Sequence, residues 1–243
     1  MKIAYVTGGM GGIGTSLCQR LHQDGFKVIA GCGPSRDHAK WIAEQAALGY
    51  AFDASAGNVG DWNSTESAFA AVKAEHGPID VLVNNAGITR DVIFRKMTRA
   101  DWDAVIETNL TSLFNVTKQV IDDMVERGWG RIINISSVNG EKGQFGQTNY
   151  SAAKAGMHGF TMALAQELAA KGVTVNTVSP GYIGTDMVKA IRQEVLDKIV
   201  AGIPVKRLGT PEDIASMVSW LASDESGFAT GADFSVNGGL HMH

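Results

Sequence analysis

The chain has 243 residues, of which 44% are hydrophobic and 19% are charged, and its formal net charge is −4. This composition excludes an intrinsically disordered chain, because it supplies enough apolar side chains for a large core. The 21 basic residues are outnumbered by 25 acidic ones, which argues against nucleic acid as the main partner. No stretch approaches the ~20 apolar residues of a membrane-spanning helix, so we expect no membrane partner.

The start of the chain and its cysteines indicate where the protein works. Met1–Gly8 runs directly into a strand and a glycine turn, without the long apolar run of a signal peptide, so we expect a cytoplasmic protein. Cys18 and Cys32 are too few for a disulfide framework or a zinc site, and the six histidines show no ligand spacing. We therefore expect no metal, and we expect both cysteines to be buried structural residues.

Short runs rich in Val and Ile alternate with longer helical patterns. The predicted strands are Ile3–Thr7, Lys27–Gly31, Ala51–Ser55, Val81–Asn84, Arg131–Ser136, Val173–Val178 and Asp233–Val236. Fully apolar runs such as Val81–Val83 indicate strands that are covered on both faces, as in a parallel sheet. The predicted helices are Ile13–Asp24, Arg36–Leu48, Ser64–Glu75, Arg99–Arg127, Thr148–Lys171 and Pro211–Ala222.

Two of these helices have clear start signals. Thr98-Arg99-Ala100-Asp101 resembles a capping box, and Thr210 precedes a proline in the first turn and two acids near the positive end of the helix dipole. No linker, repeat or low-complexity segment interrupts the alternation. We predict one α/β domain over residues 1–243, a doubly wound parallel sheet of Rossmann type with helices on both faces.

The segment 182–208 departs from this alternation. It contains Gly184, Gly202 and Pro204, together with a helical stretch around Met187–Val200. A long excursion between the sixth strand and the last helix is typical of a substrate lid, although an ordinary surface insertion has the same pattern. We expect a small lid here.

A glycine-rich turn ends the first strand and opens the first helix. Gly8, Gly12 and Gly14 form a Gly-x3-Gly-x-Gly pattern. Such glycines let the backbone approach a pyrophosphate, whose charge meets free N–H groups at the helix terminus. With Met10 and Ile13 they are candidate cofactor-binding residues; a chance cluster among the 29 glycines is the alternative.

The end of the second strand indicates which dinucleotide is bound. An NAD site places an acidic residue ~20 residues beyond the glycine motif, where it holds the ribose 2′-hydroxyl. Here the chain reads Gly33-Pro34-Ser35-Arg36, with no acid at the strand end. Ser35 and Arg36 can donate hydrogen bonds and charge to a 2′-phosphate, so the predicted cofactor is NADP(H), with Gly33 beside it.

Further cofactor candidates follow the third and fourth strands. Asn58 and Val59 are expected to pack on the adenine. Asn85, Ala86 and Gly87 end the fourth strand at the edge where open α/β sheets bind ligands. Ordinary turn formation explains these Asn and Gly residues equally well.

Three residues predict a carbonyl-reducing centre. Ser137 follows the fifth strand, while Tyr150 and Lys154 are four residues apart on one face of the next helix. A neighbouring ammonium favours phenolate, so we expect Lys154 to lower the pKa of Tyr150 from its usual ~10. Tyr150 then protonates a carbonyl oxygen as hydride arrives, while Ser137 hydrogen-bonds the developing alkoxide.

The chain resembles the short-chain dehydrogenase/reductase family over essentially its whole length. The resemblance rests on the order of four motifs: the glycine turn, Asn-Asn-Ala-Gly, the serine after the fifth strand, and Tyr-x3-Lys. The resemblance implies a catalytic tetrad of Asn109, Ser137, Tyr150 and Lys154, in which Asn109 holds a water that passes protons to Lys154. Tyr150 and Lys154 are then cofactor-binding residues as well.

The same resemblance extends to the turn after the sixth strand. There it implies a nicotinamide-positioning role for Pro180, Gly181, Ile183 and Thr185. The chain departs from the family at Asn58, where Asp is more frequent, and this places the adenine contact in question.

Longer stretches narrow the resemblance. Asn84–Asp91 is similar to the 3-oxoacyl thioester reductases, which act on acyl carrier protein or coenzyme A. Gly143–Tyr150, Gly31–Pro34 and Asn237–Met242 are similar to the reductases of polyhydroxyalkanoate synthesis. This implies reduction of a short 3-oxoacyl-CoA, such as acetoacetyl-CoA, to the (R)-3-hydroxyacyl-CoA. The alternatives are a carrier-protein reductase of fatty-acid synthesis and a non-catalytic NADP-sensing protein, against which the tetrad argues.

Amide and aromatic residues beside the catalytic helix are the candidates for binding this acyl-CoA thioester. They can hydrogen-bond a 3-keto thioester and limit acyl length, although loop packing is the alternative. The basic stretch 90–99 suits a carrier protein or coenzyme A phosphates, so charge does not decide between them. The amide and aromatic candidates are Gln144, Phe145, Gln147 and Tyr182, and Asp91 and Lys96 of the stretch 90–99 are further candidates.

The resemblance also points to a symmetric homotetramer, a common closed arrangement. Apolar residues on more than one face of the helices at 99–127 and 148–171, Phe114 and Met162 among them, agree with this expectation.

Overall fold

A parallel sheet organises the chain, which the computed structural model describes over residues 1–185, 188 and 192–242. Its order is β3-β2-β1-β4-β5-β6-β7, which confirms the predicted Rossmann-type fold. The central strand β1 pairs in parallel on both sides, so that Tyr5 lies beside Ile29 and Leu82. The strands are β1 (Ile3–Val6), β2 (Lys27–Cys32), β3 (Phe52–Ala56), β4 (Val81–Asn84), β5 (Gly130–Ile135), β6 (Val173–Pro180) and β7 (Asp233–Val236).

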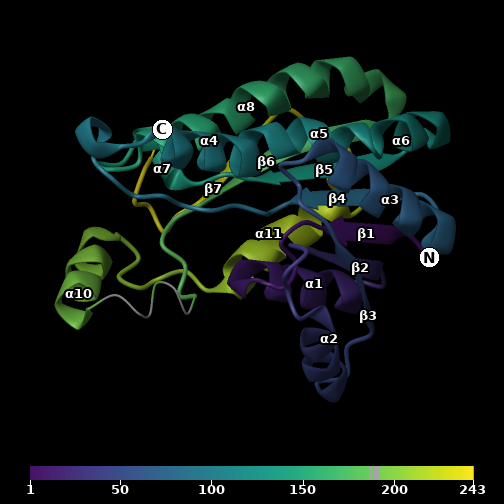
Figure 1. Cartoon of the computed structure of the whole chain (residues 1–243), viewed down its shortest axis with the longest axis horizontal. Helices are drawn as coiled ribbons and strands as arrows, with labels where there is room; N and C mark the ends of the chain where they lie inside the picture. The colour runs from purple at the N-terminus through teal and green to yellow at the C-terminus, as the bar shows by residue number, and fades with distance from the viewer. Residues whose placement is uncertain (186–187, 189–191, 243) are drawn as a thin grey trace.

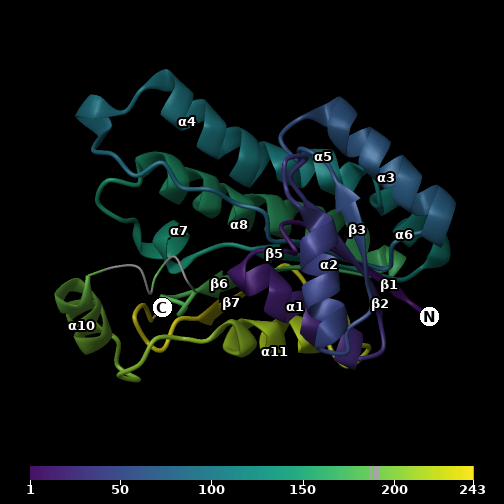
Figure 2. The ribbon, with the colours of Figure 1, turned by 60° about the horizontal axis from the view of Figure 1, so that its bottom comes forward.

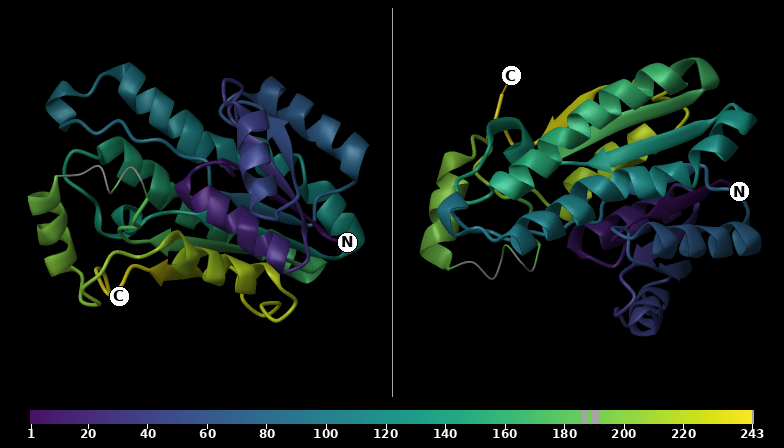
Figure 3. Two further views of the ribbon diagram at one scale, coloured as in Figure 1. Left: turned by 90° about the horizontal axis from the view of Figure 1, so that it is seen from below. Right: turned by 45° about the horizontal axis from the view of Figure 1, so that its top comes forward.

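Helices cover both faces of the sheet (Figure 1). One face carries α1 (Gly12–Gln23), α2 (His38–Ala47) and α11 (Pro211–Ala222). The other face carries α3 (Trp62–His76), α4 (Arg99–Ile106), α5 (Ser112–Lys118), α6 (Ile121–Arg127) and α8 (Thr148–Leu168). Two further views show the same two layers of helices (Figure 3).

Each face of the sheet has its own hydrophobic core. Leu17 of α1 and Ile214 of α11 are fully buried in the first core. Phe69 of α3, Met124 of α6 and Leu168 of α8 belong to the second. Burying a side chain of this kind contributes about 1.5–3 kcal/mol, so the two cores hold the strand ends in fixed relative positions.

The prediction of one continuous helix over Arg99–Arg127 is wrong. After α4 the chain forms a π-helical segment, η2 (Glu107–Thr111), before α5 begins. The side-chain amide of Asn109 bonds both backbone groups of Ile88, and this contact holds the wider turn. Such π-turns inside helices often occur at functional sites. A second break at residues 119–120 separates α5 from α6.

Smaller differences concern helix ends and short elements. The predicted helix Thr148–Lys171 is α8 followed by a 3₁₀ turn, η3 (Ala169–Lys171). The sequence analysis missed η1 (Phe94–Lys96) and the short helix α7 (Val138–Lys142). Both predicted start signals are confirmed as capping boxes, at the start of α4 and of α11.

The expected lid contains α10 (Gln193–Gly202), which stands apart from the sheet beside the carboxyl ends of the strands (Figure 2). The sequence predicted a helical stretch around Met187–Val200, of which residues 187 and 189–191 lie outside the described residues. A lid function for 182–208 therefore stays a prediction.

Two further observations concern the cysteines and the membrane. Cys18 and Cys32 are both free and buried, as expected of structural cysteines. No helix in the described part of the chain combines the length and the apolar character needed to cross a membrane.

Candidate active site

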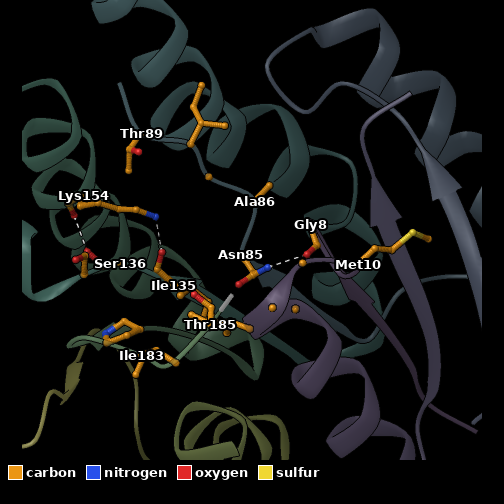
Figure 4. A pocket seen from close by; sticks show the side chains of 18 of the residues that line it. Gly8, Met10, Asn85, Ala86, Thr89, Ile135, Ser136, Lys154, Ile183 and Thr185 are labelled. Atoms are coloured by element: carbon orange, nitrogen blue, oxygen red, sulfur yellow. Dashed lines mark hydrogen bonds between the residues drawn. The ribbon is translucent and has the colours of Figure 1, made fainter. Parts of the chain in front are cut away.

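A cavity of about 570 Å³ opens at the carboxyl ends of the strands. Its walls come from the β1–α1 turn, the ends of β2, β4, β5 and β6, and the first turns of α8 (Figure 4). This edge of an open α/β sheet is where ligands bind, and the volume suits a small-molecule site.

The glycine turn forms one wall of the cavity. Gly8 has a φ of +61°, which only glycine adopts readily. A Cβ on Gly12 would lie 2.9 Å from Cγ2 of Thr185, across the cavity mouth. A Cβ on Gly14 would lie 2.1 Å from the carbonyl oxygen of Gly8, so this glycine lets α1 approach the turn.

The first turn of α1 fits the pyrophosphate of a dinucleotide. Its N-cap, Gly11, offers no side-chain cap, and the turn contains no acidic residue. The N–H groups of the helix start are therefore open to an anion, and the helix dipole favours one. The predicted residues Gly8, Met10, Gly12 and Ile13 all line the cavity here.

The end of β4 ties the glycine turn to the rest of the site. Asn85 donates hydrogen bonds from Nδ2 to the carbonyl oxygens of Thr7, at 3.0 Å, and Gly8, at 3.1 Å (Figure 4). Asn85, Ala86 and Gly87 line the cavity as predicted. The neighbouring Asn84 is buried and bonds the side chains of other strands and helices, so its role is structural.

Three successive residues at the end of β5 lie against helix α8, which carries Tyr150 and Lys154. The carbonyl oxygen of Ile135 accepts a hydrogen bond from Nζ of Lys154 at 2.7 Å. Oγ of Ser136 donates to the carbonyl oxygen of Lys154 at 2.9 Å (Figure 4). Oγ of Ser137, the N-cap of α7, accepts from the N–H of Asn139 at 3.1 Å, and this hydroxyl is near enough to Tyr150 to lower the pKa of its phenol. The structure thus brings the predicted serine, tyrosine and lysine together at one end of the cavity.

Asn109 lies behind this group, fully buried on the π-helical segment. Its Oδ1 accepts from the N–H of Ile88 at 2.8 Å, and its Nδ2 donates to the Ile88 carbonyl at 2.9 Å. A Cβ on Gly87 would lie 3.3 Å from Oδ1 of Asn109 and 3.6 Å from Nζ of Lys154. Asn109 and Lys154 therefore flank the same glycine, which suits the predicted tetrad. A water held by Asn109 stays a prediction.

Burial sets the pKa values of Lys154 and Tyr150. It lowers the pKa of Lys154 to about 7. It also raises the pKa of Tyr150; a hydrogen bond from Ser137 opposes this rise, and the negative charge of Asp91 adds to it. The expectation that Lys154 lowers the pKa of Tyr150 is therefore wrong for this structure, because burial raises that pKa above its usual value. The phenol of Tyr150 therefore stays protonated near neutrality.

Comparison with known proteins identifies the family. The model for short chain dehydrogenases matches residues 2–196. The chain belongs to the short-chain dehydrogenase family. It is an oxidoreductase, and members of the family use NAD or NADP.

Individual relatives cover nearly the whole chain. The chain is 78% identical to an acetoacetyl-CoA reductase of Cupriavidus necator, over 99% of this chain and 98% of the relative. It is 59% identical to nodulation protein G of Azospirillum brasilense, with the same coverage. It is 46% identical to a 3-oxoacyl-[acyl-carrier-protein] reductase of Vibrio cholerae, again over 99% and 98%.

The side of the cavity beyond β2 is where a short-chain dehydrogenase would meet the adenosine. Gly33 and Arg36 line the cavity, and Nη2 of Arg36 donates to the carbonyl oxygen of Met10 at 3.2 Å. Ser35 is exposed beside them and is not part of the lining. The carboxylate of Asp37 caps α2 by accepting from the N–H of Lys40, so it is engaged away from the cavity.

Asn58 and Val59 are not among the residues that line the cavity. The side chain of Asn58 accepts a hydrogen bond from the N–H of Gly60 at 3.1 Å, which is turn chemistry. Val59 packs against the second hydrophobic core. The adenine contact of these two residues stays a prediction.

The turn after β6 forms the opposite wall. Pro180, Gly181, Ile183 and Thr185 all line the cavity, and β6 continues to Pro180, two residues further than predicted. The sequence analysis missed several lining residues, most of which lie within two residues of a predicted one. They are Gly11, Gly31, Cys32, Ile88, Thr89, Ile135, Ser136 and Val188.

The candidate substrate residues fall into two groups. Tyr182 lines the cavity directly. Outside the lining, Nε2 of Gln147 donates to Oδ2 of Asp91 at 2.8 Å, and Oε1 of Gln147 accepts from Asn139 at 3.0 Å. The backbone N–H of Val92 donates to the carbonyl of Gly146, so the two loops of the cavity mouth are joined.

The remaining candidates are more loosely placed. Oε1 of Gln144 accepts from Nζ of Lys142 at 3.1 Å. Phe145 is 87% exposed, so its ring does not confine the cavity in this structure. Lys96 lies on η1, in the loop that also carries Asp91. Substrate roles for these residues stay predictions.

Proposed function

We propose that the protein reduces acetoacetyl-CoA, a short 3-oxoacyl-CoA thioester, to the (R)-3-hydroxyacyl-CoA, with NADPH as the hydride donor. One observation carries the proposal: Ser137, Tyr150 and Lys154 meet at the end of the glycine-lined cavity, in a chain 78% identical to an acetoacetyl-CoA reductase. The product would then serve as a precursor for polyhydroxyalkanoates, a role supported by the similarity of Gly143–Tyr150 and Asn237–Met242 to reductases of that synthesis.

The side chains have separate tasks in this reaction. NADPH, when bound along the glycine turn and the end of β6, would supply the hydride that adds to C3 of the substrate. The phenol of Tyr150 gives its proton to the C3 oxygen, and the Ser137 hydroxyl donates a hydrogen bond to the same oxygen as negative charge develops on it. Lys154, whose pKa is about 7, stands beside Tyr150 to return the proton near neutral pH. Asn109 holds the water through which Lys154 is reprotonated.

The proposed preference for NADPH rests on the end of β2. Arg36 lies at the cavity wall, and the nearest carboxylate in sequence, that of Asp37, is engaged as a helix cap. A guanidinium without a competing carboxylate favours a 2′-phosphate over a 2′-hydroxyl.

A carrier-protein thioester is the second candidate substrate, because the chain is 46% identical to a reductase named for one. An acidic carrier protein needs exposed positive charge at the cavity mouth. Arg99 of the basic stretch 90–99 is paired with Asp103 at 2.7 Å, and the rest of the stretch suits either substrate. We favour the coenzyme A thioester because the identity to an acetoacetyl-CoA reductase, 78%, is the higher of the two.

Loss of NADPH absorbance with acetoacetyl-CoA, compared with the matched acetoacetyl carrier protein, tests this choice. We expect the higher kcat/KM with acetoacetyl-CoA, and a lower value with long-chain 3-oxoacyl-CoA. A carrier-protein substrate more than about tenfold better by kcat/KM would favour the alternative.

We further infer a cytoplasmic homotetramer with a lid over residues 182–208. Phe114 is 58% exposed and Met162 is 53% exposed, on α5 and α8, which lie on the same face of the sheet. The ring of Trp62 packs beside that of Phe114 in a tilted arrangement, with centroids 5.8 Å apart. Burying such a patch against a second copy supports assembly.

A further inference from the structure

A histidine continues the catalytic face of α8. Tyr150, Lys154 and His158 follow one another at intervals of four residues, which places them on one side of the helix. Nε2 of His158 lies 2.9 Å from Oγ of Ser136. Ser136 itself is 3% exposed and lines the cavity next to Ser137.

The direction of this hydrogen bond follows from the proton count. A hydroxyl has one proton, and Ser136 gives it to the carbonyl oxygen of Lys154 at 2.9 Å. The bond to His158 therefore uses Oγ as the acceptor and Nε2–H as the donor. His158 thus holds the Ser136 hydroxyl in the orientation in which it reaches the Lys154 carbonyl.

His158 also faces β7, and because its Nε2 already carries a proton, Nδ1 can donate to β7 only when the imidazole is protonated. Its Nδ1 lies 3.5 Å from Oδ2 of Asp233, and the two side chains are 22% and 16% exposed. Oγ of Ser179, on β6, donates to both carboxylate oxygens of Asp233, at 2.8 and 3.0 Å. A chain of polar contacts therefore runs from β7 through His158 and Ser136 to the backbone of Lys154.

The same edge of β7 also contacts α7. Ser235 is two residues after Asp233 and so on the same face of the strand. Its hydroxyl donates to the carboxylate of Glu141 in α7, the helix that Ser137 caps. Both elements that carry the catalytic hydroxyls, α7 and α8, are therefore tied to one face of β7.

We propose that His158, which faces Asp233, is a positioning residue for hydride transfer. Through Ser136 it fixes the α8 backbone at Lys154 against the end of β5, and this sets the separation of Ser137 from Tyr150. The inference rests on the proposed roles of Tyr150 and Lys154. A positioning error of a fraction of an ångström at these groups costs turnover rather than binding.

Two amide substitutions isolate the bond to Ser136. In His158→Gln the side-chain amide nitrogen can occupy the position of imidazole Nε2. In His158→Asn the side chain is one methylene shorter, so its amide nitrogen lies near the position of Nδ1 and cannot reach Ser136. We expect His158→Gln to keep kcat within about threefold of the wild type, and His158→Asn to lower it on the order of 10-fold or more. The KM values for acetoacetyl-CoA and NADPH stay within about threefold in both variants.

Thr161→Val is the matched control for loss of a buried polar contact. Thr161 lies about two turns beyond Lys154 on α8, and its hydroxyl bonds Asn134 on β5 and Thr177 on β6, each at 2.8 Å. This variant should lower the melting temperature without lowering kcat. Ser136→Ala should reproduce the kcat loss of His158→Asn, and the double variant should lose no more than either single variant.

Tyr150→Phe, measured in parallel, distinguishes a failure of the proposed catalytic roles from a failure of the positioning role of His158. If Tyr150→Phe retains turnover, the proposed roles of the catalytic residues fail. If Tyr150→Phe is inactive while His158→Asn keeps the wild-type kcat, the positioning role alone is overturned. It is also overturned if His158→Gln is as slow as His158→Asn, or if Thr161→Val lowers kcat equally.

Discussion

Nζ of Lys154 donates a hydrogen bond to the backbone carbonyl of Ile135 at 2.7 Å, in an interior where the lysine is 3% exposed. The amine is therefore fixed at the end of β5 although no carboxylate is paired with it in the described residues. Because burial disfavours the ammonium, the pKa of Lys154 is about 7 instead of 10.5. This places its proton exchange near the pH at which the reaction is expected to run.

The lowered pKa of Lys154 predicts how stability depends on pH. The amine loses its proton near pH 7 in the folded protein and near pH 10.5 in the unfolded chain. Between these values the unfolded chain binds more protons, so this group makes the wild type more stable as pH rises. Relative to the wild type, Lys154→Met should therefore be most stabilised at or below pH 7, and its advantage in free energy of unfolding should shrink by about 4–5 kcal/mol towards pH 10.5.

Urea unfolding of both proteins near pH 7 and near pH 10 measures this difference, and Lys171→Met, on the exposed turn after α8, is the control. An advantage of Lys154→Met that is the same at both pH values would show that the amine is not desolvated.

Removing the proton donor should stop turnover without removing the cofactor. Tyr150→Phe keeps the ring but loses the hydroxyl, so we expect no measurable reduction of acetoacetyl-CoA and nearly unchanged NADPH binding. Ser137→Ala should lower kcat on the order of 100-fold, as loss of one oxyanion donor does. Tyr50→Phe, at a phenol that accepts a bond from Gln23, is the control. A near-normal rate for Tyr150→Phe would contradict the assignment.

Arg36 should decide the choice of dinucleotide. Arg36→Ala should raise the KM for NADPH on the order of 10-fold or more, because a charged hydrogen bond to the 2′-phosphate is lost, and should leave that for NADH nearly unchanged. Lys40→Ala, on the exposed side of α2, controls for a general loss of positive charge. Equal use of NADPH and NADH by the wild type would refute the argument from the 2′-phosphate.

Gln147 should act through binding. Gln147→Ala removes the amide that donates to Asp91, so the cavity mouth loses one of its cross-links. We expect the KM for acetoacetyl-CoA to rise about 5- to 10-fold while kcat changes less than about threefold, and Tyr182→Ala should behave similarly. Gln166→Ala, on the exposed face of α8, is the control. A fall in kcat at unchanged KM would assign Gln147 to the chemical step instead.

Assembly can be tested by light scattering at micromolar concentration. We expect four copies per particle for the wild type. Phe114→Lys places a charge in the exposed apolar patch and should shift the population towards smaller species. Leu48→Lys changes a residue that is 65% exposed on another part of the surface and should not. A monomeric wild type would refute the homotetramer.

The sequence by itself determined the features that depend on neighbours along the chain. Alternating apolar runs and helical periods predicted the strands, because each strand is covered on both faces. Local capping predicted the starts at Thr98 and Thr210. The glycine turn and the Tyr150–Lys154 spacing needed no knowledge of distant contacts, so both could be recognised in advance.

Tertiary structure decided the properties that depend on contacts between distant segments. The π-turn at Asn109 forms around a bond to Ile88, 21 residues earlier, which helical periodicity does not encode. The raised pKa of Tyr150 and the lowered pKa of Lys154 result from burial, which exists only once α8 packs on the sheet.

The placement of His158 against Ser136 and Asp233 is of the same kind. Ser136 lies 22 residues before the histidine, and Asp233 is on a strand near the other end of the chain. Spacing in sequence shows which side chains share a helix face. Packing sets the burial of each side chain and its hydrogen-bond partners across the sheet. The residues that packing brings together are far apart in sequence, and their spacing does not predict the contact.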